Sequence, residues 1–110
     1  MIARKRSRAG RVEELTLKGM PLGAFHNFPY QQTSVELESG DVVLLLSDGL
    51  SEIFNSRREM LGMECIGTAL KEVGSAMPDA IADHLRETIA RWRDGSPQDD
   101  DITFVILKKR

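Results

Sequence analysis

Acidic residues lie at the ends of the two most apolar stretches of this chain. Asp48 directly follows the stretch "VVLLLS" at 42–47, and three aspartates at 99–101 directly precede the stretch "ITFVIL" at 102–107. A carboxylate at the end of a buried strand is costly unless it is hydrated, paired or bound to a metal ion. These acids are therefore the first candidates for chemistry.

Two acidic strand ends can form one site. If the strands are antiparallel neighbours, the end of one meets the start of the other, and Asp48 converges with one of the three aspartates. Strand alternation separates Asp100 from Asp99 and Asp101. A hard cation such as Mg²⁺ or Mn²⁺ offsets the repulsion between carboxylates and keeps waters that can attack a phosphoester. The structural alternative stays open, because Asp-Gly is a common turn and acids often protect strand ends.

The strands that position these acids follow from the hydrophobic pattern. The stretches at 42–47 and 102–108 are apolar on both faces, which predicts a sandwich with helices on one face of the sheet and a second sheet on the other. Further strands are predicted at 11–17 and 30–37. The strand at 30–37 is expected to form a hairpin with the one at 42–47 across a tight turn at 38–41.

Two amphipathic helices are predicted between the acidic strand ends. The first, before Gly74, has apolar residues at steps of three and four, and the second runs from Pro78 to Gly95. Their stripes are Met63, Ile66, Leu70 and Val73 in the first helix and Ile81, Leu85, Ile89 and Trp92 in the second. The resulting order, β-β-β-α-α-β, predicts an α+β fold.

Composition limits the class of protein. The chain has 110 residues, of which 41% are hydrophobic and 29% charged, as expected for one globular domain. It has no apolar run of about 20 residues and no apolar signal-peptide core, so no membrane association is expected. A single cysteine, Cys65, excludes an internal disulfide and indicates a reducing compartment, so we expect a cytoplasmic protein.

The first ten residues form a basic segment, a candidate N-terminal arm separate from a domain at 11–110. Arg4, Lys5, Arg6 and Arg8 lie in it without any acid, although the net charge of the chain is −2. Such an arm could contact nucleic-acid phosphates, or it could be a frayed terminus or a strand cut from its neighbours. The acidic strand ends argue against a nucleic-acid-binding domain, because without a bound metal ion they would repel phosphate.

Three motifs in order resemble one known family. "GMPLGAF" at 19–25, "GDVVLLLSDGLSE" at 40–52 and "QDDDITFVIL" at 98–107 are similar to segments of the bacterial metal-dependent protein phosphatases of the PPM type. The resemblance is to the branch of stage II sporulation protein E and the phosphatases that regulate sigma factors, and it covers residues 11–110. It implies a portion of an α-β-β-α sandwich, in which antiparallel sheets are flanked by helices.

The resemblance also implies a site and an activity. Asp48 and Asp100 would ligate Mn²⁺ or Mg²⁺, with Asp99 as an extra acid. The family's remaining ligands of a two-metal site come from an upstream segment that nothing here matches, so the chain resembles the C-terminal portion of the domain. The implied reaction is hydrolysis of phosphoserine or phosphothreonine on a regulatory protein, an anti-sigma-factor antagonist in this branch.

The incompleteness of the match has two consequences. The isolated chain is expected to be inactive or weakly active, and a catalytically dead interaction module (a pseudophosphatase) is the alternative function. Strands that are apolar on both faces would also leave apolar surface exposed, so we expect the chain to self-associate.

Four other residues have two interpretations each. His26 and His84 could act as general acids, but a single histidine is more often structural. Arg57 and Arg58 follow Asp48 along the chain and could bind a substrate phosphate, or they could belong to a solvated loop.

Overall fold

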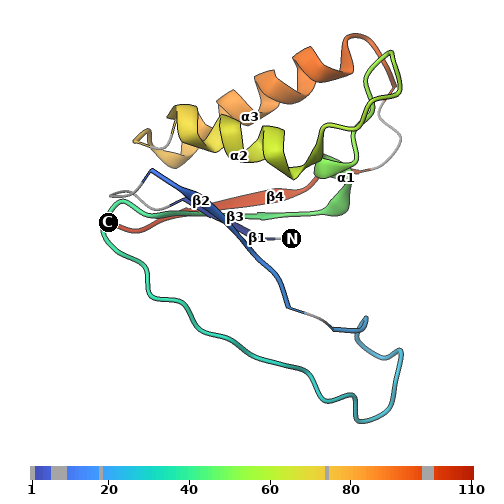
Figure 1. The fold of residues 1–110 in the computed structure, drawn as a ribbon, viewed down its shortest axis with the longest axis vertical. Helices are drawn as coiled ribbons and strands as arrows, with labels where there is room; N and C mark the ends of the chain where they lie inside the picture. The colour runs from blue at the N-terminus through green and yellow to red at the C-terminus, as the bar shows by residue number, and fades with distance from the viewer. Residues whose placement is uncertain (1, 6–9, 18, 74, 98–100) are drawn as a thin grey trace.

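The protein forms one antiparallel four-stranded sheet with helices on one face (Figure 1). The structure is a computed structural model, and it describes residues 2–5, 10–17, 19–73, 75–97 and 101–110. The strand order in the sheet is β2-β1-β3-β4. In chain order the elements are β1 (Ile2–Lys5), β2 (Val12–Leu15), β3 (Val42–Leu46), α1 (Asp48–Ser51), α2 (Gly62–Val73), α3 (Pro78–Arg93) and β4 (Phe104–Lys108).

Strand β3 is central, with β1 on one side and β4 on the other. It is antiparallel to β4, and the register runs from Val42 opposite Lys108 to Leu46 opposite Phe104. The last residue of β3 therefore lies opposite the first residue of β4. This is the neighbour relation that the acidic strand ends required, and it is confirmed.

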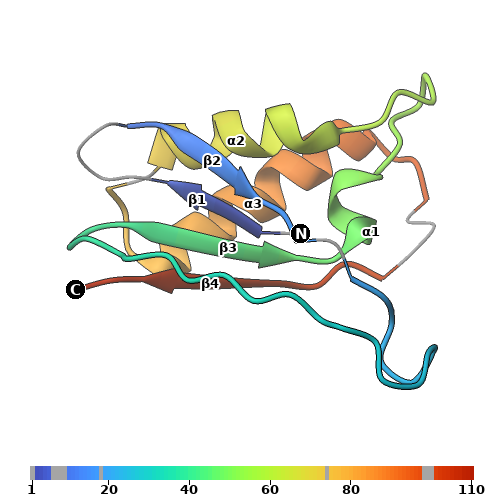
Figure 2. The same cartoon turned by 60° about the horizontal axis from the view of Figure 1, so that its bottom comes forward.

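Helices α2 and α3 lie side by side over one face of the sheet (Figures 1 and 2). Their predicted stripes face the sheet and form the core with alternate residues of β3. The buried members of that core are Val42, Leu44 and Leu46 from β3, Ile66 and Leu70 from α2, and Ile81, Leu85 and Ile89 from α3. Within the described ranges, no helix has the length and apolar character needed to cross a membrane.

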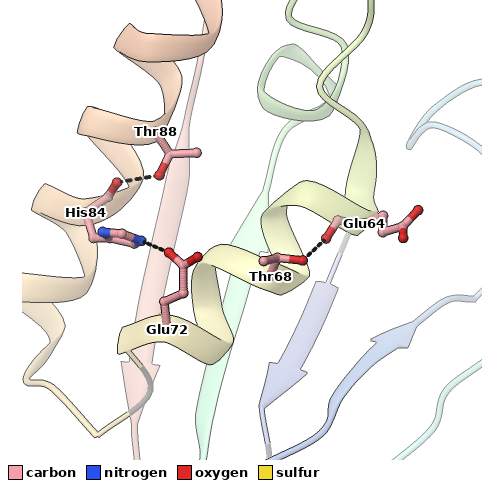
Figure 3. A network of polar contacts seen from close by, with 5 residues as sticks. All are labelled: Glu64, Thr68, Glu72, His84 and Thr88. Carbon is pink, nitrogen blue, oxygen red and sulfur yellow. Dashed lines mark hydrogen bonds and ion pairs between the residues drawn. The ribbon is translucent and has the colours of Figure 1, made fainter.

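Polar contacts fix the helical layer. His84 Nε2 on α3 lies 2.9 Å from Glu72 Oε2 on α2 and joins the two helices (Figure 3). Lys108 Nζ on β4 donates to the carbonyls of Ser75 (3.0 Å) and Ala76 (2.8 Å) in the connection between α2 and α3. The helices are therefore tied both to each other and to the strand that begins at the acidic cluster.

The second face of the sheet is partly open. Val105 and Leu107 of β4 are 50% and 51% exposed, and Leu45 of β3 is half-buried. The coverage of both faces predicted from the sequence is thus not reached among the described residues. The exposure of apolar strand surface, which the sequence also led us to expect, is confirmed for β4.

The predicted strand at 30–37 is wrong. The chain from 19 to 41 forms a long irregular excursion that leaves the sheet and returns at β3 (Figure 1). Both edges of β3 are already occupied by β1 and β4, so a hairpin partner has no free edge to pair with. The turn at 38–41 does form, with the Asp41 amide donating to Glu38 O (2.9 Å) and the Glu38 amide donating to Asp41 Oδ2 (3.0 Å).

The frayed-arm interpretation of the N-terminus is wrong for Ile2–Lys5. These residues form β1, which pairs with both β2 and β3 inside the sheet. Basic composition hid this strand, because the sequence of the segment has no alternation that marks a buried element. The boundary between residues 10 and 11 stays a prediction.

Candidate functional site

Ser47 joins the end of β3 to the residues just before β4. Its amide donates to Thr103 O (2.9 Å), and its hydroxyl oxygen accepts from the Thr103 amide (3.0 Å). Ser47 precedes α1 at the position where serine often caps a helix, but its side chain makes no capping bond. The hydroxyl instead extends the pairing of the two strands by one residue at the acidic end of the sheet.

Gly49 allows the backbone before β4 to lie directly on α1. A Cβ at this position would lie less than 3.0 Å from Asp101 O and 3.1 Å from Asp101 C. No real Cβ tolerates the first of these distances, so only glycine permits this approach. The glycine is buried, and its neighbour across the contact belongs to the acidic cluster.

Asp48 lies at this junction as the first residue of α1. Its side chain is exposed, and its carboxylate makes no hydrogen bond or ion pair with the described part of the chain. Its backbone carbonyl accepts from the amide of Glu52 (3.0 Å), so the turn of α1 fixes the position of Asp48. The carboxylate is therefore anchored at its backbone and open to solvent.

The structure brings Asp48 and Asp101 to the same end of the sheet, through the Gly49 contact. The predicted second ligand, Asp100, and its neighbour Asp99 lie outside the described residues, so their pairing with Asp48 stays a prediction. Within the ranges that the structure describes, no group of three acidic, histidine or cysteine side chains is placed to hold a metal ion.

The histidines and arginines have different surroundings. His84 contacts Glu72 on the helical layer, which supports its structural interpretation. His26 is exposed in the irregular excursion. Arg57 and Arg58 are exposed in a short hairpin loop, residues 54–60, that is closed by a bridge between Phe54 and Met60.

Sequence reasoning singled out Asp48 but missed the two residues beside it that build the junction. Neither Ser47 nor Gly49 is a residue type that marks a metal site, and the Asp-Gly pair suggested a common turn only as the structural alternative. The signal was present in the motif itself, because a glycine that follows an acidic strand end can allow a close backbone approach.

Comparisons with known proteins identify the family. The family profile described as Stage II sporulation protein E (SpoIIE) matches residues 2–110. Stage II sporulation protein E of Bacillus subtilis is 28% identical over 102 residues, which cover 92% of this chain and 12% of that protein. Phosphoserine phosphatase RsbU of Bacillus subtilis is 24% identical over 97 residues, covering 88% of this chain and 28% of that protein.

Solved structures share the fold. The SiaA-PP2C domain of Pseudomonas aeruginosa matches 99% of this chain with a TM-score of 0.82 at 22% identity. The phosphatase domain of SpoIIE from Bacillus subtilis, from a manganese-presoaked sample, matches 98% with a TM-score of 0.70 at 23% identity. The chain spans only 42% and 45% of these two structures. The chain thus belongs to the stage II sporulation protein E family, and its fold is a portion of a PPM-type (PP2C) phosphatase domain.

Proposed function

We propose that this chain contributes to the metal-dependent hydrolysis of phosphoserine or phosphothreonine on a regulatory protein. The observation that supports this most is the junction at which Ser47, Gly49 and Asp101 bring the end of β3 against the start of β4. The exposed carboxylate of Asp48 lies at that junction, which supports Asp48 as the metal ligand that the family motifs imply. The family match over residues 2–110 supports the reaction class.

Asp48 and Asp100 are the proposed ligands of a Mn²⁺ or Mg²⁺ ion. Asp48, the member of the pair that the structure describes, suits such an ion, because its carboxylate offers two hard oxygens that are not hydrogen-bonded to any described residue. The SpoIIE phosphatase domain of Bacillus subtilis was studied in a manganese-presoaked sample, which supports a manganese ion by analogy. When bound, a divalent cation supplies Lewis-acid stabilisation and lowers the pKa of coordinated water.

The residues of this chain would contribute position rather than proton transfer. The turn of α1 holds the backbone of Asp48, and the Ser47 hydroxyl fixes the strand end on which it lies. Gly49 sets the distance between that strand end and the acidic segment before β4. A site assembled on backbone contacts of this kind limits how far its two carboxylates can separate.

The remaining metal ligands are proposed to come from outside this chain. It spans less than half of the solved phosphatase structures that it matches, and a two-metal site needs more ligands than Asp48 and Asp100. We therefore expect little or no turnover by the isolated 110 residues. The proposed substrate is a phosphorylated anti-sigma-factor antagonist, an inference supported by similarity to the phosphoserine phosphatase RsbU.

A chimaeric phosphatase tests the proposal. This chain would replace the matched segment of RsbU, and phosphate release from a phosphoserine peptide would be measured with and without Mn²⁺. We expect Mn²⁺-dependent release that falls strongly in the chimaera with Asp48→Asn, because the proposed metal site loses a ligand. Asp79→Asn, which changes an exposed acid on α3, is the matched control and should keep full activity.

The same experiment distinguishes the proposed phosphatase from the alternative function, a catalytically dead interaction module. A chimaera that folds, by circular dichroism, yet releases no phosphate with Mn²⁺ would favour the catalytically dead interaction module. A folded chimaera whose activity is unchanged by Asp48→Asn would contradict the assignment of the ligand.

A further inference from the structure

A cavity with both polar and apolar lining residues opens near α1, and Asp48 is not one of the described residues that line it. It has a volume of about 340 Å³ and is lined by Phe54, Asn55, Ser56, Arg58, Ser96 and Pro97. One wall is the hairpin loop (54–60), and the other is the turn that follows α3. Both walls lie at the end of the sheet that carries α1 (Figures 1 and 2).

The hairpin-loop wall is held rigidly. Asn55 Oδ1 accepts from the amides of Arg57 and Glu59, both at 2.9 Å, and the Arg58 amide donates to Asn55 O (3.0 Å). Trp92 Nε1 on α3 donates to Glu59 O (3.2 Å) and to the carbonyl of Ile53 (3.0 Å), the residue directly before the loop. These contacts keep Arg58 in a left-handed conformation, with φ at 59°.

The second wall is also anchored to α3. Arg93 Nε donates to Ser96 O (3.1 Å), and the Ser96 amide donates back to Arg93 O (2.8 Å). Because Trp92 and Arg93 are adjacent on α3, the two walls are held by neighbouring residues of one helix. Little conformational entropy is then lost when a ligand enters, which favours binding.

Among the described residues, nothing compensates the charge of Arg58 in this cavity. The Arg58 guanidinium makes no hydrogen bond or ion pair with any described residue, while the nearby Glu59 accepts instead from Asn55 Nδ2 (3.3 Å). The hydroxyls of Ser56 and Ser96 add two potential donors, and the ring of Phe54 adds an apolar wall. A planar guanidinium with hydroxyl donors suits a carboxylate or a phosphoryl group.

We propose that this cavity, the Arg58 pocket, binds an oxyanion of the substrate polypeptide close to the scissile phosphoester. The inference rests on the proposed function, since it takes the reaction to occur at Asp48. The sequence supports that placement, because Pro97 lies two positions before Asp99 and Phe54 follows α1 by only a short connection. Arg58 is thus a specificity residue rather than a catalytic one.

The proposal is tested by binding alone, without added metal. The ¹⁵N-labelled 110-residue chain would be titrated with sodium acetate and with inorganic phosphate at constant ionic strength, with sodium chloride as the reference salt. We expect saturable shifts of the Arg58 and Ser96 amides. A stronger response to acetate would identify a carboxylate as the preferred group, and a stronger response to phosphate would identify a phosphoryl group.

Two variants keep the loop while removing the charge. Arg58→Asn and Arg58→Gly both tolerate a positive φ, so the hairpin loop should persist. We expect either variant to weaken anion binding about fivefold, which is the upper end of what a solvent-exposed ion pair contributes to affinity. Arg57→Ala is the matched control, because Arg57 lies in the same loop but does not line the cavity.

Two results would overturn the proposal. One is a lack of saturable shifts at the Arg58 and Ser96 amides. The other is unchanged affinity in both Arg58 variants. The anion titration uses no metal and measures no turnover. Its result can therefore be interpreted even if the chimaera shows no phosphatase activity.

Discussion

Replacing Gly49 with alanine should destabilise the fold, although helix propensity alone predicts the opposite. Alanine favours a helix over glycine by about 0.8–1.0 kcal/mol per residue. At Gly49, however, the new Cβ would lie less than 3.0 Å from Asp101 O and 3.1 Å from Asp101 C, and backbone cannot rotate away as a flexible side chain can. Overpacking of this kind typically costs about 1–3 kcal/mol.

Gly67→Ala in α2 is the matched control, because its Cβ would lie 3.6 Å from Val12 Cγ1, an ordinary contact. Thermal unfolding followed by circular dichroism should show Gly67→Ala at or above the parent Tm. Gly49→Ala should melt roughly 4–12 °C below this control, which has the same gain in helix propensity, at about 4 °C per kcal/mol for a domain of this size. A Gly49→Ala protein as stable as the control would refute the close contact between α1 and the acidic segment.

Three further predictions address other contacts of the fold. Ser47→Ala should cost about 1 kcal/mol in unfolding free energy, because the Thr103 amide loses its acceptor; an unchanged denaturant midpoint would contradict this. Trp92→Phe should accelerate amide hydrogen exchange across the hairpin loop, since two hydrogen bonds from the indole are lost; unaltered exchange rates would show that the indole does not hold the loop. The parent chain should self-associate at micromolar concentration in sedimentation, and the double variant Val105→Ser with Leu107→Ser should associate less, because both exposed apolar side chains of β4 are replaced. A monomeric parent that binds no hydrophobic dye would contradict the exposed strand face as an association surface.

The elements with strong periodicity were predictable from the sequence. The apolar stripes of α2 and α3 mark the helix face that must be buried, and the apolar run of β3 marks a strand that must be buried. Neither conclusion depends on which elements pack against them. Antiparallel pairing of β3 with β4 was the condition under which the two acidic strand ends could meet, and the structure fulfils that condition.

The misplaced strands depended on neighbours that a single sequence does not reveal. Ile2–Lys5 forms β1 because an edge of β3 is available to it, and the segment at 30–37 stays irregular because no edge of β3 is left. Strand formation is decided by such pairing more than by residue preference. At the site, the acidic side chain was recognisable from its type, whereas Ser47 and Gly49 became meaningful only once their backbone contacts were known.

Calorimetric titration with Mn²⁺ tests the central claim, that Asp48 and Asp100 together hold a cation at the junction of β3 and β4. The parent chain should bind one Mn²⁺ weakly, and Asp48→Asn and Asp100→Asn should each weaken binding at least about tenfold, because a single carboxylate is a poor site for a hard cation. Asp79→Asn on α3 should bind as the parent does. Equal Mn²⁺ binding by the parent and both ligand variants would contradict the assignment of the site.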